Sequence, residues 1–267
     1  MAGGGSSLRR SVGSVSRAIA LLDALAESEM GVGVNELARQ IGVNPSTASR
    51  LLSTLQEAGL VERSGGGPYR LGLKLVALSD RVLAQLDVRQ QARPLLARLV
   101  AETGETATLS VPGGGEVITV DFIPSPSSVV SMARVGRPSV LHATAAGKVM
   151  LAFGDRGTPG ESDPLIAFTE RTITNRDALA RELECVRERG YAEAVGEREP
   201  DLGALAAPVF GRGSELAAIL GIQGPASRLP AATRRALREP LLGAAAELGR
   251  ALGAPARGRS APGIRTM

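Results

Sequence analysis

The 267-residue chain is poor in the residue types that build cross-linked or metal-bound sites. It holds one cysteine, Cys185, so no internal disulfide can form, and this fits a reducing cytosol. With His142 as the single histidine, the chain offers too few His and Cys ligands for a zinc-type site. We therefore expect neither a metal nor a cofactor.

Aromatic residues make up 2% of the chain and tryptophan is absent, whereas hydrophobic residues make up 43%. Aliphatic side chains must therefore fill the cores, and the length suggests about two domains. No apolar run reaches the roughly 18 residues that span a membrane. The start of the chain lacks the apolar segment of a signal peptide, so we expect a cytosolic protein.

The charge balance is basic, at +4 with a pI near 9.9, which suits a nucleic-acid partner without proving one. Part of the excess lies in residues 254–267, which we predict to be a disordered basic tail. Residues 1–11 are rich in Gly and Ser and are predicted to be a flexible arm.

Apolar residues at three- and four-residue spacing predict three short helices after the arm. Asn35 is a plausible N-cap for the second helix, and Gly42 supplies the sharp turn that follows it. Asn44 and Pro45 open the third helix as N-cap and first residue. This order predicts a helix-turn-helix with helices over 14–27, 35–42 and 45–58.

The third helix carries short hydroxyl side chains and one arginine, Arg50, on its outer face. Such a face can approach DNA closely, and an arginine can reach a guanine edge or a phosphate. An ordinary solvated face is the alternative, but such faces usually carry Glu and Lys. The outer face comprises Ser46, Thr47, Ser49, Arg50, Ser53 and Thr54.

Two short β-like runs, 60–63 and 69–73, flank a Gly-rich turn directly after the third helix. This pattern predicts a hairpin, and a hairpin in this place is a wing. Arg63 and Arg70 flank its tip and are predicted to bind the sugar-phosphate backbone.

The rest of the chain mixes strands with helices without a repeating βαβ order, which predicts an α+β fold. Residues 74–87 are predicted to form a linker helix, and Pro94 stands near the start of a further helix that ends before Gly104. Strands are predicted over 106–111, 117–123, 129–135, 205–210 and 216–222. Helices are predicted over 143–153, 177–189 and 231–252.

Catalytic machinery is hard to assemble from this sequence. His142 lies too close in sequence to Ser139 and Thr144 for a triad, whose members converge from distant segments, and a lone histidine is more often a cap or a core hydrogen-bonder. Residues 145–148 only superficially resemble a phosphate-binding loop. We interpret Glu197, Glu199 and Asp201 as solvated loop charges. The helix-turn-helix favours a DNA-binding regulator. The alternative is an enzyme whose winged helix serves only assembly or autoregulation, but we predict no catalytic residues.

Several segments taken together resemble the isocitrate lyase regulator (IclR) family of transcription factors. They are SVSRAIALLDALAE, VNELARQIGVNPSTASRLLSTLQEAGLVER, YRLGLKLVAL, TGETATLSV, LHATAAGKVMLA, RTITNRDALARELECVRERGYA and LAAPVF, and they cover about 12–252. The resemblance implies a winged helix-turn-helix over 12–73, a linker helix over 74–87 and a GAF/profilin-like α/β effector-binding domain over 88–253.

The resemblance also implies a homodimer or homotetramer that binds a pseudo-palindromic double-stranded DNA operator and acts as a repressor, an activator or both. We expect a ligand-responsive regulator, with repression favoured. The predicted DNA contacts are Arg17, Ser46, Thr47, Ser49, Arg50, Arg63, Tyr69 and Arg70. The predicted effector contacts are Thr144, Ala145, Ala146, Asp201, Ala204, Gly221 and Gln223.

Family members that bind small polar acids tend to carry Cys or Ser at the positions of Ala204, Gly221 and Gln223. The small residues here predict an enlarged, unusually apolar pocket and an aromatic or otherwise apolar effector rather than glyoxylate or pyruvate. Asp201, where the family usually has Gly, either faces solvent or accepts a hydrogen bond from the ligand. A domain that only oligomerises, without an effector, is the alternative.

Overall fold

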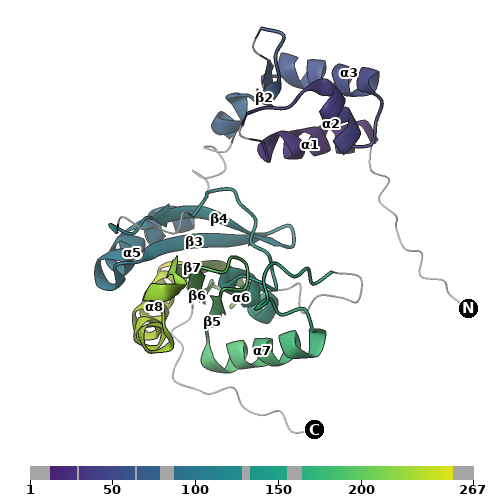
Figure 1. Cartoon of the computed structure of the whole chain (residues 1–267). Helices are drawn as coiled ribbons and strands as arrows, with labels where there is room; N and C mark the ends of the chain where they lie inside the picture. The colour runs from purple at the N-terminus through teal and green to yellow at the C-terminus, as the bar shows by residue number, and fades with distance from the viewer. Residues whose placement is uncertain are drawn as a thin grey trace, which may run out of the picture. The chain divides into compact units, whose positions relative to one another are not determined.

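The computed structural model describes residues 13–28, 30–63, 65–78, 87–127, 133–154 and 164–254. The chain divides into two compact units, 1–85 and 86–267 (Figure 1). The predicted arm, the predicted tail from residue 255 onward and residues 79–86 of the predicted linker lie outside the described residues, while 74–78 are helical. Within the described residues, no helix is long and apolar enough to cross a membrane.

The first unit is a three-helix domain followed by a two-stranded hairpin, as predicted. Its elements are α1 (Gly13–Ala26), α2 (Val34–Gln40), α3 (Pro45–Glu57), β1 (Val61–Arg63) and β2 (Tyr69–Leu71). The strands are antiparallel, with Glu62 opposite Arg70. The helices and the hairpin share one aliphatic core, formed by Leu21, Leu25, Leu37, Leu52, Leu55, Val61 and Tyr69.

Local sequence explains where α3 begins. Asn44 accepts a hydrogen bond from the Thr47 N–H at 2.8 Å, and Pro45 occupies the first turn, where a missing N–H is harmless. Gly42 has φ +68°, a backbone conformation that favours glycine, and makes the turn between α2 and α3. The cap predicted for α2 is wrong: Gly33 precedes this helix without a side-chain cap, and Asn35 lies inside it.

The second unit is built on a five-stranded antiparallel sheet in the order β4-β3-β7-β6-β5. The helices α5 and α8 pack on one face, α6 packs on the other, and α7 packs on α6 (Figure 1). Its strands are β3 (Thr106–Gly113), β4 (Glu116–Ile123), β5 (Ala192–Val195), β6 (Leu202–Phe210) and β7 (Leu216–Pro225). Its helices are α5 (Asp87–Thr103), α6 (Ala145–Phe153), α7 (Arg176–Arg189) and α8 (Ala231–Ala251), with a short η1 (Ala226–Arg228). The α+β prediction is confirmed.

Three details differ from the prediction. Pro94 lies inside α5 rather than near its start, because the helix begins at Asp87. Of the strand predicted over 129–135, residues 133–135 are coil and turn, and the rest lies outside the described residues. The sequence pattern did not indicate β5, whose four residues include two alanines and a glutamate, types that are uncommon in strands.

Candidate functional site

The first unit presents α3 as its candidate DNA-binding surface. Ser46, Ser49 and Arg50 are exposed, and Thr47 is half-buried beside the Asn44 cap. Arg17 is exposed on α1. The opposite side of α3 is buried through Ala48, Leu52 and Leu55, so the hydroxyl-rich face is the one left available to a partner.

The wing is shaped by Arg63. Its guanidinium donates to the carbonyl oxygens of Gly66 and Gly67 at 2.9 and 3.0 Å, and it stacks over the Tyr69 ring at 4.9 Å. Tyr69 itself is 5% exposed and belongs to the core, which differs from its expected place among the DNA contacts. Burial gives Tyr69 a packing role beneath Arg63 rather than a place on the candidate DNA-binding surface.

Arg70 also makes an internal contact, because its Nε and Nη2 both donate to the carbonyl oxygen of Met30 at 3.3 and 3.1 Å. A guanidinium has five N–H donors, so Arg63 and Arg70 each keep donors for a phosphate while their positions are fixed by the protein. Both side chains are exposed.

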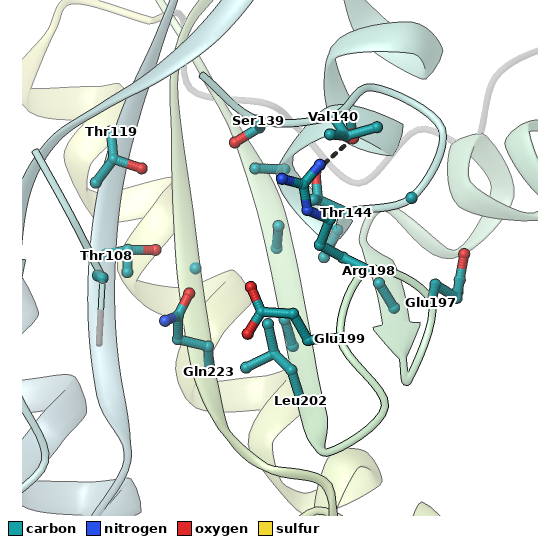
Figure 2. Close-up of a pocket in the computed structure, with 18 of the residues that line it drawn as sticks. Thr108, Thr119, Ser139, Val140, Thr144, Glu197, Arg198, Glu199, Leu202 and Gln223 are labelled. Atoms are coloured by element: carbon teal, nitrogen blue, oxygen red, sulfur yellow. Dashed lines mark hydrogen bonds between the residues drawn. The ribbon is translucent and has the colours of Figure 1, made fainter. Parts of the chain in front are cut away.

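The second unit contains a cavity of about 860 Å³ on the sheet face that α6 covers. All seven predicted effector residues line it: Thr144, Ala145, Ala146, Asp201, Ala204, Gly221 and Gln223. They come from the start of α6, the loop before β6 and two central strands, so residues up to 79 positions apart in sequence meet at one cavity. Figure 2 labels Thr144 and Gln223 from this set, together with other residues that line the cavity.

Strand alternation explains the sheet wall of this cavity. Thr108 on β3 pairs with Gly221 on β7, which in turn pairs with Ala206 on β6. Side chains at these positions point to the same face, because neighbouring residues across a sheet share a side. A Cβ added to Gly221 would lie 2.5 Å from the Thr108 Oγ1. The Thr108 hydroxyl therefore occupies the space that a side chain at position 221 would need.

The α6 wall begins at a tight turn. Thr144 is the N-cap: its hydroxyl donates to the Val140 carbonyl oxygen at 2.8 Å and accepts from the Gly147 N–H at 3.0 Å. A Cβ on Gly147 would lie 2.5 Å from backbone atoms of Val140 and Leu141, so only glycine fits there. Ala145 and Ala146, in the first turn of α6, line the cavity at the positive end of the helix dipole.

The cavity is more polar than predicted. Besides small and aliphatic residues, its lining includes four hydroxyl-bearing residues and three arginines: Thr108, Ser110, Thr119, Ser139, Arg134, Arg137 and Arg198. Burial, and then the nearby Arg137 charge, lower the pKa of Arg198. The resemblance drew attention to β6 and β7, whereas most of these groups come from β3, β4 and the loops. In the sequence, the hydroxyl residues at alternating positions 108 and 110 of a predicted strand are the pattern that could indicate a polar wall.

Glu197 also differs from the prediction, because it is 9% exposed rather than solvated. The Lys148 Nζ, on α6, donates to its Oε1 at 2.6 Å and to the Glu193 carbonyl oxygen at 2.9 Å. The Glu197 Oε2 is buried without a hydrogen-bond partner, and burial raises the pKa of this carboxyl despite Lys148. A buried ion pair thus joins α6 to the loop that borders the cavity.

His142 lies in the core as a hydrogen-bonder, which confirms that interpretation. It is 6% exposed, and its Nε2 lies 3.0 Å from the Ile166 carbonyl oxygen. The described part of the chain contains no group of three or more His, Cys, Asp or Glu residues that could hold a metal ion.

Comparison with known protein families decides the identity of this architecture. Residues 14–65 match the IclR helix-turn-helix domain, and residues 80–250 match the C-terminal domain of bacterial IclR transcriptional regulators. The chain belongs to the IclR family. This IclR-family protein is therefore a transcriptional regulator with a helix-turn-helix DNA-binding domain.

Relatives match over nearly the whole regulator. The HTH-type transcriptional regulator XynR of Escherichia coli is 34% identical over 91% of this chain and 98% of its own length. A crystal structure of an IclR regulator from a Silicibacter species has a TM-score of 0.77 and 30% identity, covering 91% of this chain and 97% of that one. An IclR homologue from Microbacterium hydrocarbonoxydans, solved with 4-hydroxybenzoate, has a TM-score of 0.71 and 27% identity over 89% and 99%.

Proposed function

We propose that this IclR-family regulator is a repressor whose affinity for its operator is controlled by a small molecule bound in the cavity of the second unit. One observation carries the proposal: the cavity gathers all seven residues expected to contact an effector. Its volume of about 860 Å³ falls within the roughly 300–1,000 Å³ of small-molecule pockets. The similar IclR homologue solved with 4-hydroxybenzoate supports a small organic ligand.

In the proposed complex with DNA, α3 enters the major groove and the wing contacts the backbone. The proposed contacts are Arg17, Ser46, Thr47, Ser49, Arg50, Arg63 and Arg70. All of these side chains except the half-buried Thr47 are exposed, and this exposure and the fixed positions of the two wing arginines support the assignment. Arg50 is the candidate for reading a base edge, because arginine can donate two hydrogen bonds to guanine.

The operator is proposed to be pseudo-palindromic and to bind a dimer, or a tetramer of two dimers. A single recognition helix contacts little DNA, and two-fold symmetry doubles that contact. Apolar side chains are exposed after the wing, where the predicted linker helix begins: Leu73 is 75% exposed and Val76 is 56% exposed. These exposed apolar side chains support dimerisation through this segment, because a second subunit would bury them.

The proposal is tested with the purified full-length protein and the DNA upstream of its own gene. We expect a gel shift that is specific against unrelated DNA of the same length and that weakens when an effector is added. Deleting the gene should raise transcription from this promoter, whereas a fall would show activation. A broad hydrolase screen of the same preparation tests the enzymatic alternative, and activity without specific DNA binding would contradict the proposal.

A further inference from the structure

The charges that line the cavity leave a cationic group available. Glu197 is paired with Lys148, and Glu199 lies 3.6 Å from Arg137. Arg198 has no ion-pair partner among the described residues, and its guanidinium stacks over the Phe168 ring at 4.4 Å. With those two carboxylates engaged, Asp201 is the one other acid in the described lining of the cavity, beside Arg198 and Arg134.

The loop that carries Arg198 is fixed in place by two threonine hydroxyl groups and by a buried ion pair. Thr169 donates to the Gly196 carbonyl oxygen at 2.5 Å, and Thr172 donates to the Glu197 carbonyl oxygen at 2.6 Å. Glu197 is fixed by Lys148 at 2.6 Å. Figure 2 shows Arg198 reaching toward the cavity while Glu197, one residue earlier, points away from it. Arg198 is therefore preorganised for a ligand, which lowers the entropy lost on binding.

The opposite wall offers a hydroxyl group. Thr108 lies on the far side of the pocket from Arg198 in Figure 2, and its hydroxyl has no hydrogen-bond partner within the described residues. The neighbouring Ser110 hydroxyl, in contrast, lies 3.3 Å from that of Thr119. Gly221 leaves space around the Thr108 Oγ1 that any side chain would fill. A polar group in a cavity favours ligands that can pair with it.

We propose that Arg198 and Thr108 determine effector specificity, and that the effector is a hydroxylated carboxylate. Its carboxylate binds the Arg198 guanidinium, and a hydroxyl group at its other end bonds the Thr108 hydroxyl. The inference rests on the proposed function, since it assigns the ligand of the same cavity. The bound carboxylate would also relieve the repulsion between Arg198 and Arg137, because an anion placed at Arg198 offsets both positive charges.

Isothermal titration of the full-length protein with matched compounds tests the charge and the hydroxyl separately. The hydroxylated carboxylates are gluconate and 4-hydroxybenzoate, within a panel of hydroxy acids of similar size. Their neutral counterparts are glucitol and 4-hydroxybenzyl alcohol, and their counterparts without hydroxyls are hexanoate and benzoate. The variants are Arg198→Gln, Arg198→Lys and Thr108→Val. Arg181→Gln, at an exposed α7 position outside the cavity lining, is the matched control.

We expect at least one hydroxylated carboxylate to bind the wild type more tightly than both of its counterparts. Arg198→Gln should weaken that binding about 10- to 100-fold, with partial recovery in Arg198→Lys. Thr108→Val should weaken binding of the hydroxylated carboxylate about 2- to 10-fold. The affinity of this variant for the counterpart without hydroxyls should stay within about twofold of the wild-type value. Arg181→Gln should bind like the wild type. Unchanged thermal unfolding of each variant confirms that the effects are not losses of fold.

The inference is overturned if Arg198→Gln binds the anion as tightly as the wild type, or if neutral counterparts bind equally well. It is also overturned if no hydroxylated carboxylate binds at millimolar concentration. These outcomes leave the proposed function intact as long as some other compound changes operator affinity. If no compound of any class changes operator affinity, the proposed effector control fails as well.

Discussion

Removing the positive charge from the buried pair between α6 and the cavity loop should strongly destabilise the second unit. Lys148 is 1% exposed, and its Nζ contacts the Glu197 carboxylate at 2.6 Å. Lys148→Met keeps most of the side-chain length but leaves Glu197 charged, buried and without its main partner. Breaking a buried pair in this way typically lowers the free energy of unfolding by about 3–5 kcal/mol.

The stability of Lys148→Met should depend on pH, and the direction of this dependence follows from the pKa of Glu197. Burial already raises the pKa of Glu197, and Lys148 opposes that rise, so its removal raises the folded-state pKa further. The folded state then binds the proton more tightly than the unfolded state does, and stability increases as pH falls through the interval between the two pKa values. The slope is about 1.4 kcal/mol per pH unit within that interval.

Denaturant unfolding of the full-length protein, followed by circular dichroism at about pH 8 and about pH 5.5, measures both effects. The double variant Lys148→Met/Glu197→Leu should recover most of the lost stability, because no charge remains unpaired. The chain's other lysine, Lys74, is exposed, and Lys74→Met is the matched control with a small expected effect. A Lys148→Met variant as stable as the wild type, or one that loses stability as pH falls, would refute the reasoning.

The remaining predictions concern DNA binding and assembly. Arg50→Ala should weaken binding to the specific operator by about 1–3 kcal/mol at fixed salt, and an unchanged titration would contradict base reading. Replacing Arg63 or Arg70 by Gln should weaken binding to all sequences about equally and reduce the salt slope by about one unit, whereas a loss restricted to the operator would contradict phosphate binding. Light scattering should show a dimer or a tetramer, and Leu73→Asp with Val76→Asp should shift it toward monomer; a monomeric wild type would contradict the assembly proposed above.

The first unit was predictable because its signals are local in sequence. The Asn44 cap, Pro45 and the turn glycine each act within a few residues, and the hairpin follows from two short runs around a Gly-rich turn. Tyr69 shows the limit of this reasoning. Its neighbours at the wing suggested a DNA contact, but its ring lies in the core under Arg63, and that depends on packing against other helices.

The cavity was predictable in location and not in chemistry. The resemblance placed seven residues that do line one cavity, but residues on loops and on β3 supply most of its polar groups. Whether Glu197 or Arg198 faces the cavity depends on a partner 49 residues away, Lys148, which holds Glu197 behind the loop. Neither composition nor strand alternation contains that information, because the pairing exists only after α6 has docked on the sheet.

The close approach between Gly221 and Thr108 couples any change at one of these positions to the other. A serine or cysteine at position 221 would place its Cβ 2.5 Å from the Thr108 Oγ1, so the Thr108 side chain would have to rotate or become smaller. Either change moves or removes the hydroxyl group that Thr108 presents to the cavity. A side chain gained at position 221 therefore alters the polar group already present at position 108, and this wall of the cavity changes at two positions through one substitution.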